Sequence, residues 1–228
     1  SLHDALPISF FKKTFADPAF RPDLLKIYPC VVTKFSPLFQ LWKNKKYHPL
    51  TTRRLLHLLI VLKQIVPRYV RISRLIRDIP ATEIYGGNKV TNLRQEIQKQ
   101  MSRRQIKCRC IRCHEARVRP AKQGQVKLFC EKYSASGGEE YFLTYESKDR
   151  QTLFAFVRLR LPRQTFLPEL VDSAIVRELH TYGEVVPVGA RNKQATQHLG
   201  LGRKLMVAAE KIAGQNGFGK ITVISGIG

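Results

Sequence analysis

The chain has 228 residues, of which 43% are hydrophobic, so it can bury the core of one large domain or two small ones. Its formal net charge of +23 and isoelectric point near 10.2 predict a polyanionic partner, with nucleic acid favoured over a merely solvated basic surface. No window of about 18 apolar residues occurs, which excludes a membrane-spanning helix and leaves the cytoplasm as the expected location.

Both ends of the sequence read as the ends of a fragment. Residues 1–8, Ser-Leu-His-Asp-Ala-Leu-Pro-Ile, match the translation of a common sequencing adapter and are interpreted as a non-native scar. The last residues, 224–228, come directly after a predicted strand. We therefore expect a chain that is truncated on both sides.

Residues 9–95 alternate short apolar runs with helical patterns, which is typical of βαβ units. The predicted elements are a strand over 27–32, a helix beginning within 38–42, a helix over 51–65 and a strand over 68–75. Cys30, inside the first of these strands, is interpreted as a small buried hydrophobe. Such units occur in barrels and in doubly wound sheets, and periodicity does not choose between them.

Three closely spaced cysteines, Cys108, Cys110 and Cys113, lie in the predicted linker, residues 96–122. Tetrahedral zinc accepts such close thiolates together with one distant ligand, so we predict a structural zinc site. Iron–sulfur ligation is the main competitor, and the basic surroundings would also suit a redox-active thiol. A disulfide is disfavoured because neighbouring cysteines close strained rings and nothing indicates secretion.

Cys130 is the favoured fourth ligand of this site, because it would tie the linker to the strands that follow. An ordinary buried strand cysteine is almost as good an interpretation of Cys130, and a water or carboxylate ligand stays open. His114 is less suitable, because it is adjacent to Cys113 and the two side chains would chelate one ion awkwardly. Four protein ligands would make the site structural.

Basic residues gather in two stretches, 53–77 without any acidic residue and 99–122 with Glu115 alone. Such a density of cations binds phosphates, so RNA binding that weakens steeply with added salt is predicted. For any single arginine here, solvation or ion pairing is favoured over RNA binding, so the prediction rests on the clusters rather than on their members. The RNA-binding candidates are Arg71, Arg74, Arg77, Arg103, Arg104, Lys107, Arg109 and Arg112.

Residues 123–228 begin with three short runs rich in β-branched and aromatic residues, separated by polar turns. These runs predict a meander of strands over 125–133, 140–146 and 152–161. A fourth strand over 174–182 and a fifth over 220–225 enclose a helical pattern. The helix is therefore predicted to be a crossover between the last two strands.

A glycine-spaced turn leads directly into that helix. Free backbone N–H groups in such a turn, together with a helix N-terminus, bind phosphate groups. The turn resembles the Gln/Arg-x-x-Gly-x-Gly/Ala signature of GNAT-type N-acetyltransferases, which implies that it holds the pyrophosphate of acetyl-CoA. An ordinary glycine-containing loop is the alternative. The cofactor-binding candidates are Gln197, His198, Leu199, Gly200, Leu201, Gly202 and Arg203.

Glu178, His180 and Tyr182 are weak candidates for catalytic residues. They lie on the strand that would approach the thioester in a GNAT fold, where Glu or His can act as a general base. Strict alternation places Val176 on the same face as these three, unless a bulge interrupts the strand. A structural role is the more common one for a lone strand histidine.

Blocks spread over residues 10–228 resemble, in unbroken order, the catalytic subunit of Elongator. The blocks are residues 23–29, 41–43, 71–80, 92–94, 135–138, 177–183 and 224–228. The resemblance implies a mixed α/β and α+β fold: the last part of a radical-SAM barrel over 9–95, the zinc-binding linker over 96–122 and a truncated GNAT-type domain over 123–228.

The same resemblance implies an activity, modification of the wobble uridine of tRNA at C5 with acetyl-CoA. A radical derived from S-adenosylmethionine at a 4Fe-4S cluster would activate the acetyl methyl group. The cluster ligands are expected upstream, so this fragment is not expected to complete the reaction. The implied partners are tRNA and acetyl-CoA, with a homodimer or Elongator-type subunits compatible with the sequence.

Two other functions are kept as alternatives. One is a GNAT enzyme that acetylates protein lysine or a small amine, which would need no RNA. The other is a zinc-containing RNA-binding scaffold without catalysis, in which Gly200 and Gly202 form an empty turn.

Overall fold

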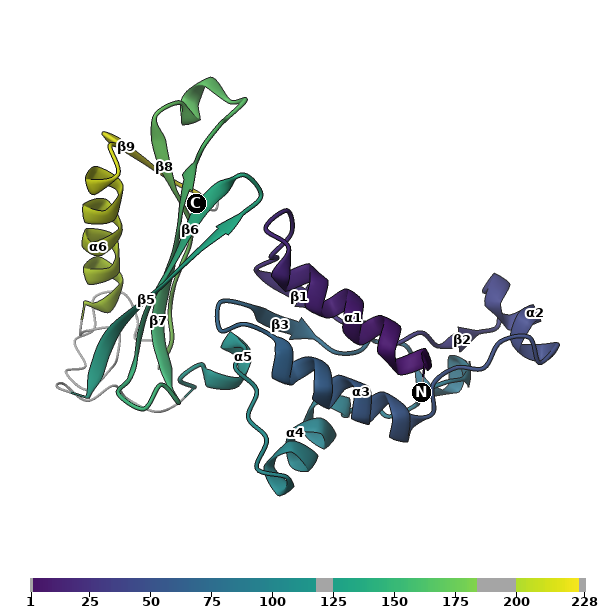
Figure 1. Ribbon diagram of the computed structural model, residues 1–228. Coiled ribbons are helices and arrows are strands. Elements are labelled where there is room, and N and C mark those ends of the chain that lie inside the picture. Colours follow the sequence, from purple (N-terminus) through teal and green to yellow (C-terminus); the bar gives the residue numbers. More distant parts are fainter. Residues whose placement is uncertain (1, 118–124, 184–199, 226–228) are drawn as a thin grey trace. The chain divides into compact units, whose positions relative to one another are not determined.

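The computed structural model describes residues 2–117, 125–183 and 200–225, which form two compact units (Figure 1). The first unit contains residues 1–16 and 22–113, and the second contains residues 17–21 and 114–228. The division between the units therefore falls directly after Cys113, within the segment predicted as a linker.

The first unit consists of helices and short paired strands. Strands β1 and β3 pair in parallel, with helices α2 and α3 between them in the chain, while β2 and β4 pair antiparallel. A parallel strand pair joined through helices is thus present, as predicted, although its first strand precedes the predicted range 27–32. The elements are α1 (Leu2–Ala16), β1 (Leu24–Lys26), β2 (Val32–Thr33), α2 (Pro37–Lys43), α3 (Thr52–Ile65), β3 (Arg71–Arg74), η1 (Ala81–Glu83), β4 (Ile84–Gly86), α4 (Leu93–Arg103) and α5 (Ile111–His114).

Helix α3 supplies much of the core of the first unit. The side chain of Thr51 caps its N-terminus by accepting a hydrogen bond from the Arg54 backbone nitrogen at 3.4 Å. Helices α1 and α4 pack against it. The buried residues of α3 are Leu55, Leu56, Leu58, Leu59, Ile60, Leu62 and Lys63. The helix is therefore buried around most of its circumference, and Lys63 is the one charged side chain among these buried residues.

The strand predicted over 27–32 is wrong for most of its length. Strand β1 ends at Lys26 and β2 begins at Val32, so the residues between them lie outside both strands. Pro29 accounts for the interruption, because proline has no N–H to donate to a ladder. Cys30, expected to be buried, is exposed. Residues 2–8, interpreted as a scar, form the beginning of α1.

The second unit is a five-stranded sheet with one long helix. The strand order is β5-β6-β7-β8-β9, with antiparallel neighbours except for the parallel pair β8 and β9. Helix α6 connects these last two strands and lies along one face of the sheet (Figure 1). The predicted meander and crossover helix are confirmed. The elements are β5 (Val126–Ala135), β6 (Gly138–Ser147), β7 (Leu153–Pro162), η2 (Pro168–Leu170), β8 (Ser173–Thr181), α6 (Leu201–Gln215) and β9 (Lys220–Val223).

The face of this sheet that packs against α6 is apolar. Ala155 pairs with Thr181, and a Cβ atom built on Gly202 of α6 would lie 3.6 Å from Thr181 Cγ2. Alternation along β7 puts Val157 and Leu159 on this same face as Ala155, and all three are fully buried. Burial of these side chains beneath α6 provides the hydrophobic stabilisation of the unit.

The opposite face carries buried charges that are paired with one another. The Glu140 carboxylate, 2% exposed, accepts hydrogen bonds from Arg160 at 2.7 Å and Arg177 at 2.8 Å. Arg158, also 2% exposed, donates to Glu178 at 2.9 Å. Because buried charges are costly without a partner, these pairs fix which residues of β6, β7 and β8 lie opposite each other.

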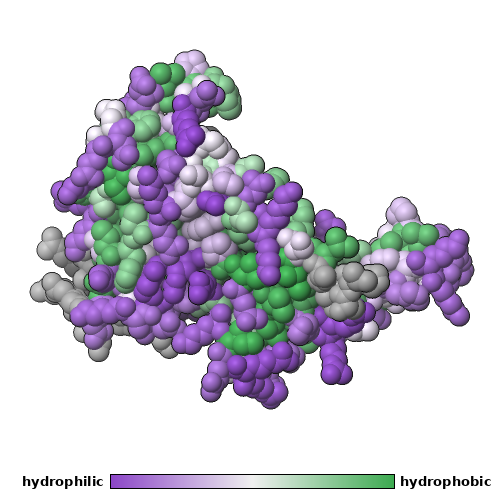
Figure 2. All heavy atoms as spheres, viewed as in Figure 1, coloured by the Kyte–Doolittle hydropathy of each residue, from purple (hydrophilic) through white to green (hydrophobic). Residues whose placement is uncertain are grey.

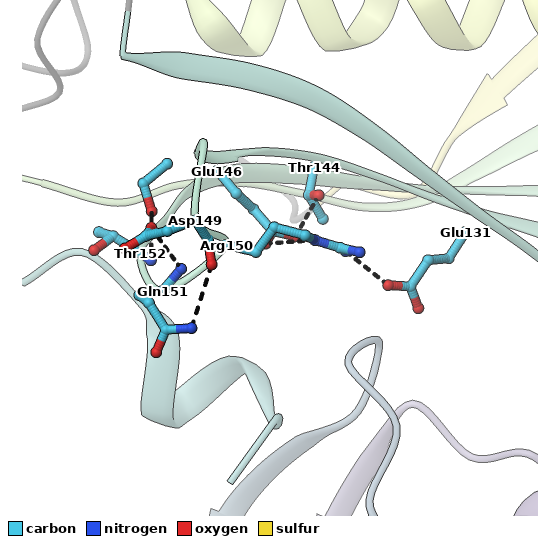
Figure 3. A network of polar contacts seen from close by, with 8 residues as sticks. Glu131, Thr144, Glu146, Asp149, Arg150, Gln151 and Thr152 are labelled. Carbon is cyan, nitrogen blue, oxygen red and sulfur yellow. Dashed lines mark hydrogen bonds and ion pairs between the residues drawn. The ribbon is translucent and has the colours of Figure 1, made fainter. Parts of the chain in front are cut away.

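A further polar network joins the turn between β6 and β7 to strand β5 (Figure 3). The Arg150 guanidinium donates to Glu131 at 2.8 Å and to Glu146 at 3.1 Å, and Thr144 donates to Glu146 at 2.7 Å. The same guanidinium lies 4.5 Å from the centre of the Phe129 ring. The turn is thereby held to two strands at once.

Candidate functional site

The three predicted metal ligands of the linker come together in the structure. The sulfur atoms of Cys108, Cys110 and Cys113 all lie within 4.8 Å of one another. The loop that carries them is attached to the first unit by a hydrogen bond from Ile111 N to Val70 O at 2.9 Å. Three converging thiols match the donor set of tetrahedral zinc, which binds thiolates at about 2.3 Å. The residues present therefore fit a metal ion of this kind.

Lys63 of α3 contacts this cluster, which sequence reasoning missed. Its ammonium, on a side chain that is 3% exposed, donates to Cys113 Sγ at 3.4 Å. Burial by itself lowers the pKa of Lys63, but the nearby cysteines outweigh burial and raise it. Hydrogen bonds from Cys108 and Cys110, aided by Lys63, lower the pKa of Cys113. The available sequence signal was a lysine directly after the apolar run 58–62 of α3.

Cys130, the predicted fourth ligand, lies on β5 in the second unit. It is paired with Leu143 in the sheet and is exposed, so the interpretation as a buried strand cysteine is wrong. Its role as a ligand stays a prediction. His114 is the last residue of α5, directly after Cys113, and is half-buried.

The helical part of the predicted coenzyme turn is observed. Gly200 precedes α6 with a φ of 61°, in the left-handed region that favours glycine, and its carbonyl accepts from Lys204 N at 3.0 Å. Leu201 is buried, while Arg203 is exposed. Gln197, His198 and Leu199 lie outside the described residues. The observed part is the first turn of a long helix, whose N–H groups have no partner within the helix itself.

A β-bulge determines where the catalytic candidates lie. Arg158 pairs with Glu178 but its neighbour Leu159 pairs with Val176, so Arg177 is an extra residue in β8. The bulge moves Val176 to the face of Leu159, opposite to Glu178. Strict alternation is therefore broken, and the bulge that the sequence left open is present.

Two of the three catalytic candidates, His180 and Tyr182, pack against Phe156, and Glu178 pairs with an arginine that also contacts this ring. The His180 ring stacks on Phe156 at 6.0 Å between centroids and lies 4.5 Å from the Tyr182 ring. Arg158, the ion-pair partner of Glu178, lies 5.3 Å from the Phe156 centroid. Tyr182 is buried and its backbone nitrogen donates to Phe154 O at 2.7 Å. These contacts are packing and pairing interactions, and catalysis by these residues stays a prediction.

The first turn of α6 and the end of β8 are neighbours. Gly202 approaches Thr181 of β8, and His180 precedes Thr181 on the opposite face of the strand. Strand β9 pairs with β8 only over Ser173–Val176. Among the described residues, β8 has no ladder partner on that side from Arg177 onward. The predicted coenzyme turn thus lies beside an open stretch of strand edge.

The predicted RNA-binding residues divide by exposure. Arg74 is exposed and pairs with Asp78 at 2.9 Å, and the exposed Arg77 lies 5.6 Å from the Tyr28 ring. Arg71 and Arg112 are half-buried. The other predicted residues, all exposed, are Arg103, Arg104, Lys107 and Arg109. Arg94 was not among the predicted site residues. Its guanidinium donates hydrogen bonds to the backbone oxygens of Ile72 at 3.0 Å and Ser73 at 3.1 Å.

A basic hollow of about 580 Å³ lies between α3 and α4. Figure 2 shows hydrophilic side chains gathered over the α4 side of this unit. Within this hollow, the Arg104 guanidinium donates a hydrogen bond to the side-chain oxygen of Gln100 at 3.4 Å. The lining residues are Thr52, Arg53, Arg54, Leu56, His57, Gln100 and Arg104. A concave surface with three arginines and no acidic lining residue suits an anion such as a phosphate.

Comparison with known proteins gives consistent relatives. Residues 22–103 match the Radical_SAM C-terminal domain. Over 96% of the chain, the sequence is 43% identical to a tRNA uridine(34) acetyltransferase of Methanocaldococcus jannaschii. Over 97% of the chain it is 42% identical to Elongator complex protein 3 of Bos taurus. Over nearly its whole length, the chain is therefore similar to proteins named tRNA uridine(34) acetyltransferase or Elongator complex protein 3.

The similarity extends to three dimensions. A solved structure of Methanocaldococcus infernus Elp3 with an N-terminal deletion of residues 1–46 matches with a TM-score of 0.85 at 38% identity. The match covers 96% of this chain and 54% of that chain. The chain spans 42% of the length of the two curated relatives above. Among the described residues, no helix is long and apolar enough to cross a membrane.

Proposed function

We propose that this chain is part of an enzyme that modifies the wobble uridine of tRNA at C5 with acetyl-CoA. The observation that carries the proposal is the identity of 43% over 96% of the chain to a protein named tRNA uridine(34) acetyltransferase. The strongly basic composition, with a net charge of +23, agrees with a tRNA substrate.

The second unit supplies the coenzyme site in this proposal. The N–H groups of the first turn of α6, after Gly200, bind the pyrophosphate of acetyl-CoA. Gly202 keeps that turn free of a side chain, and its neighbour Thr181 brings the open end of β8 close by. The acetyl group would then lie near the strand that carries His180 and Tyr182. Either side chain could orient the acetyl group or hold a proton there.

The first unit contributes tRNA contacts and the end of the radical-SAM domain. Exposed cations around α3 and α4, including Arg54 and Arg104, hold phosphates of the tRNA backbone and so position it without reading its sequence. S-adenosylmethionine with a 4Fe-4S cluster, when bound, would supply the radical that activates the acetyl methyl group. Zinc held by Cys108, Cys110 and Cys113 stabilises the loop that follows α4.

Acetyl-CoA binding by isothermal calorimetry tests the coenzyme site. Gly202→Trp is expected to abolish binding, because a large side chain would cover the N–H groups of the first turn. Gly202→Ala is the matched control, because its Cβ fits at an ordinary contact distance of 3.6 Å from Thr181 and should leave affinity within about threefold. Wild-type protein that is folded and binds tRNA without binding acetyl-CoA would favour the scaffold function.

Salt-dependent tRNA binding tests the RNA surface. The double variant Arg54→Glu and Arg104→Glu should weaken binding and flatten the dependence of log K on log salt by about two phosphate contacts or more. The double variant Lys148→Glu and Lys211→Glu, two exposed charge reversals in the second unit, is the control for net charge. Equal effects of both changes would contradict a specific site at α3 and α4. Acetyl transfer to an amine without tRNA would favour the other GNAT function.

A further inference from the structure

Lys63 is a buried cation whose partners are sulfur atoms. Other buried charged residues of the described chain, Glu140, Glu146 and Arg158, pair with side chains of opposite charge. The Lys63 ammonium instead donates to Cys113 Sγ at 3.4 Å, at the edge of the three-cysteine cluster. A buried ammonium is costly unless nearby negative charge compensates it. The thiolates of the cluster are the groups that can supply this charge.

We infer that Lys63 balances the charge of a three-thiolate metal site by donating a hydrogen bond to Cys113, without itself binding the metal. Three thiolates and one Zn²⁺ carry a net charge of −1, which the ammonium cancels. Partners outside the coordination sphere orient ligands and tune metal affinity in this way. The inference rests on the proposed zinc site and adds to it the residue that neutralises the site.

The charge balance also bears on the fourth ligand. A neutral ligand, such as water or an imidazole, leaves the site with Lys63 uncharged overall. A fourth thiolate, from Cys130 for example, would return the net charge to −1 next to buried side chains. The inference therefore favours a neutral fourth ligand over the predicted Cys130.

The test measures zinc affinity of the whole 228-residue chain by competition with a chromophoric chelator. Lys63→Met, which keeps the length of the side chain and removes its charge, should weaken zinc binding by about 10- to 100-fold. Lys63→Arg, which keeps the charge and can donate to sulfur, should lose much less. Lys99→Met is the matched control, because Lys99 is an exposed lysine on a neighbouring helix and its loss should leave affinity unchanged.

Replacing zinc by Co²⁺ adds a spectroscopic measurement. Its result would not change if Lys63 only supported the fold. Removing a hydrogen bond and a positive charge from Cys113 raises the energy of its sulfur electrons, so the sulfur-to-cobalt charge-transfer band of Lys63→Met should shift to lower energy. The visible bands that report tetrahedral coordination should keep their position and intensity. A change in those bands would show that Lys63 is itself a ligand and would overturn the inference.

The remaining outcomes are also decisive. Unchanged zinc affinity in Lys63→Met refutes the role of Lys63 while leaving the metal site intact. Wild-type protein that binds no zinc refutes the metal site itself, and with it the inference, but leaves the tRNA and acetyl-CoA proposals standing. Should Lys63→Met fail to fold, Lys63→Gln replaces it. If Lys63→Met and Lys63→Gln both fail to fold while Lys63→Arg folds and binds zinc normally, the positive charge is required. If Lys63→Arg also fails to fold, charge balance is refuted.

Discussion

Replacing Glu140 by glutamine is expected to destabilise the second unit by about 3 kcal/mol. The carboxylate is 2% exposed and accepts charge-assisted hydrogen bonds from Arg160 at 2.7 Å and Arg177 at 2.8 Å. Such bonds contribute about 1.5–3 kcal/mol each, against about 0.5–1.5 kcal/mol for neutral ones. Glutamine therefore loses about 1 kcal/mol at each contact, and turning its NH₂ toward a guanidinium costs about 1 kcal/mol more.

Two features of the site keep the expected cost below that of a fully buried pair. The Arg160 and Arg177 side chains are 19% and 25% exposed, so water can partly compensate for the lost carboxylate. Arg160 also donates to the carbonyls of Ala135 and Ser136, and these bonds do not depend on Glu140. The variant should therefore fold, with a second unit that unfolds at lower denaturant concentration.

Urea unfolding followed by circular dichroism of the β-sheet is the appropriate assay. Trp42, the single tryptophan, lies in α2 and reports the first unit by fluorescence, where no change is expected. Glu139→Gln is the matched control, because Glu139 is the neighbour on β6 and its partner Lys132 is exposed to solvent, which screens the pair, while glutamine can still accept the hydrogen bond from Ser134. If Glu140→Gln costs no more than Glu139→Gln, the buried carboxylate does not hold the three strands together.

Three further changes have expected outcomes. Glu146→Gln should lower the thermal stability of the second unit by about 1–3 kcal/mol, measured by calorimetry, because Glu146 joins Arg150 and Thr144; no effect would mean that the turn network is dispensable. Gly87→Ala should cost more in urea unfolding than Gly137→Ala, because both glycines have positive φ but a Cβ on Gly87 would also lie 3.2 Å from Cys30 O; equal costs would show that backbone strain alone decides. Dialysis against a zinc chelator should lower the melting temperature of the first unit and shift Trp42 emission, both restored by zinc; a thermogram that does not change would contradict a structural metal.

Much of the architecture was predictable because local pattern and tertiary contact agree there. The first strands of the second unit are rich in β-branched and aromatic residues and are bounded by polar turns, so the meander follows from the sequence alone. Helix α3 begins one residue after the capping Thr51 and ends at Ile65, as its spacing predicts. The strand predicted over 27–32 was wrong because the prediction gave more weight to β-branched and aromatic content than to Pro29. Proline has no N–H to pair with a neighbouring strand, so the strand is interrupted there.

The types of residue in the candidate sites could be predicted from the sequence, but the groups that surround those residues could not. The spacing of Cys108, Cys110 and Cys113 already indicated a metal site, because ligands close in sequence are brought together by one short loop. Lys63, forty-five or more positions earlier, is joined to them only by the packing of α3 against that loop. The bulge at Arg177 likewise depends on pairing between strands, which no pattern within β8 specifies.

Composition, spacing and periodicity thus determined the charge of this protein, its βαβ connection, its meander and its cluster of thiols, since each depends on neighbours along the chain. The tertiary structure alone decided that the Glu140 carboxylate lies between two arginines and that a buried ammonium faces the thiols. The physical reason is that the cost of a buried charge depends on groups that folding brings from distant parts of the sequence.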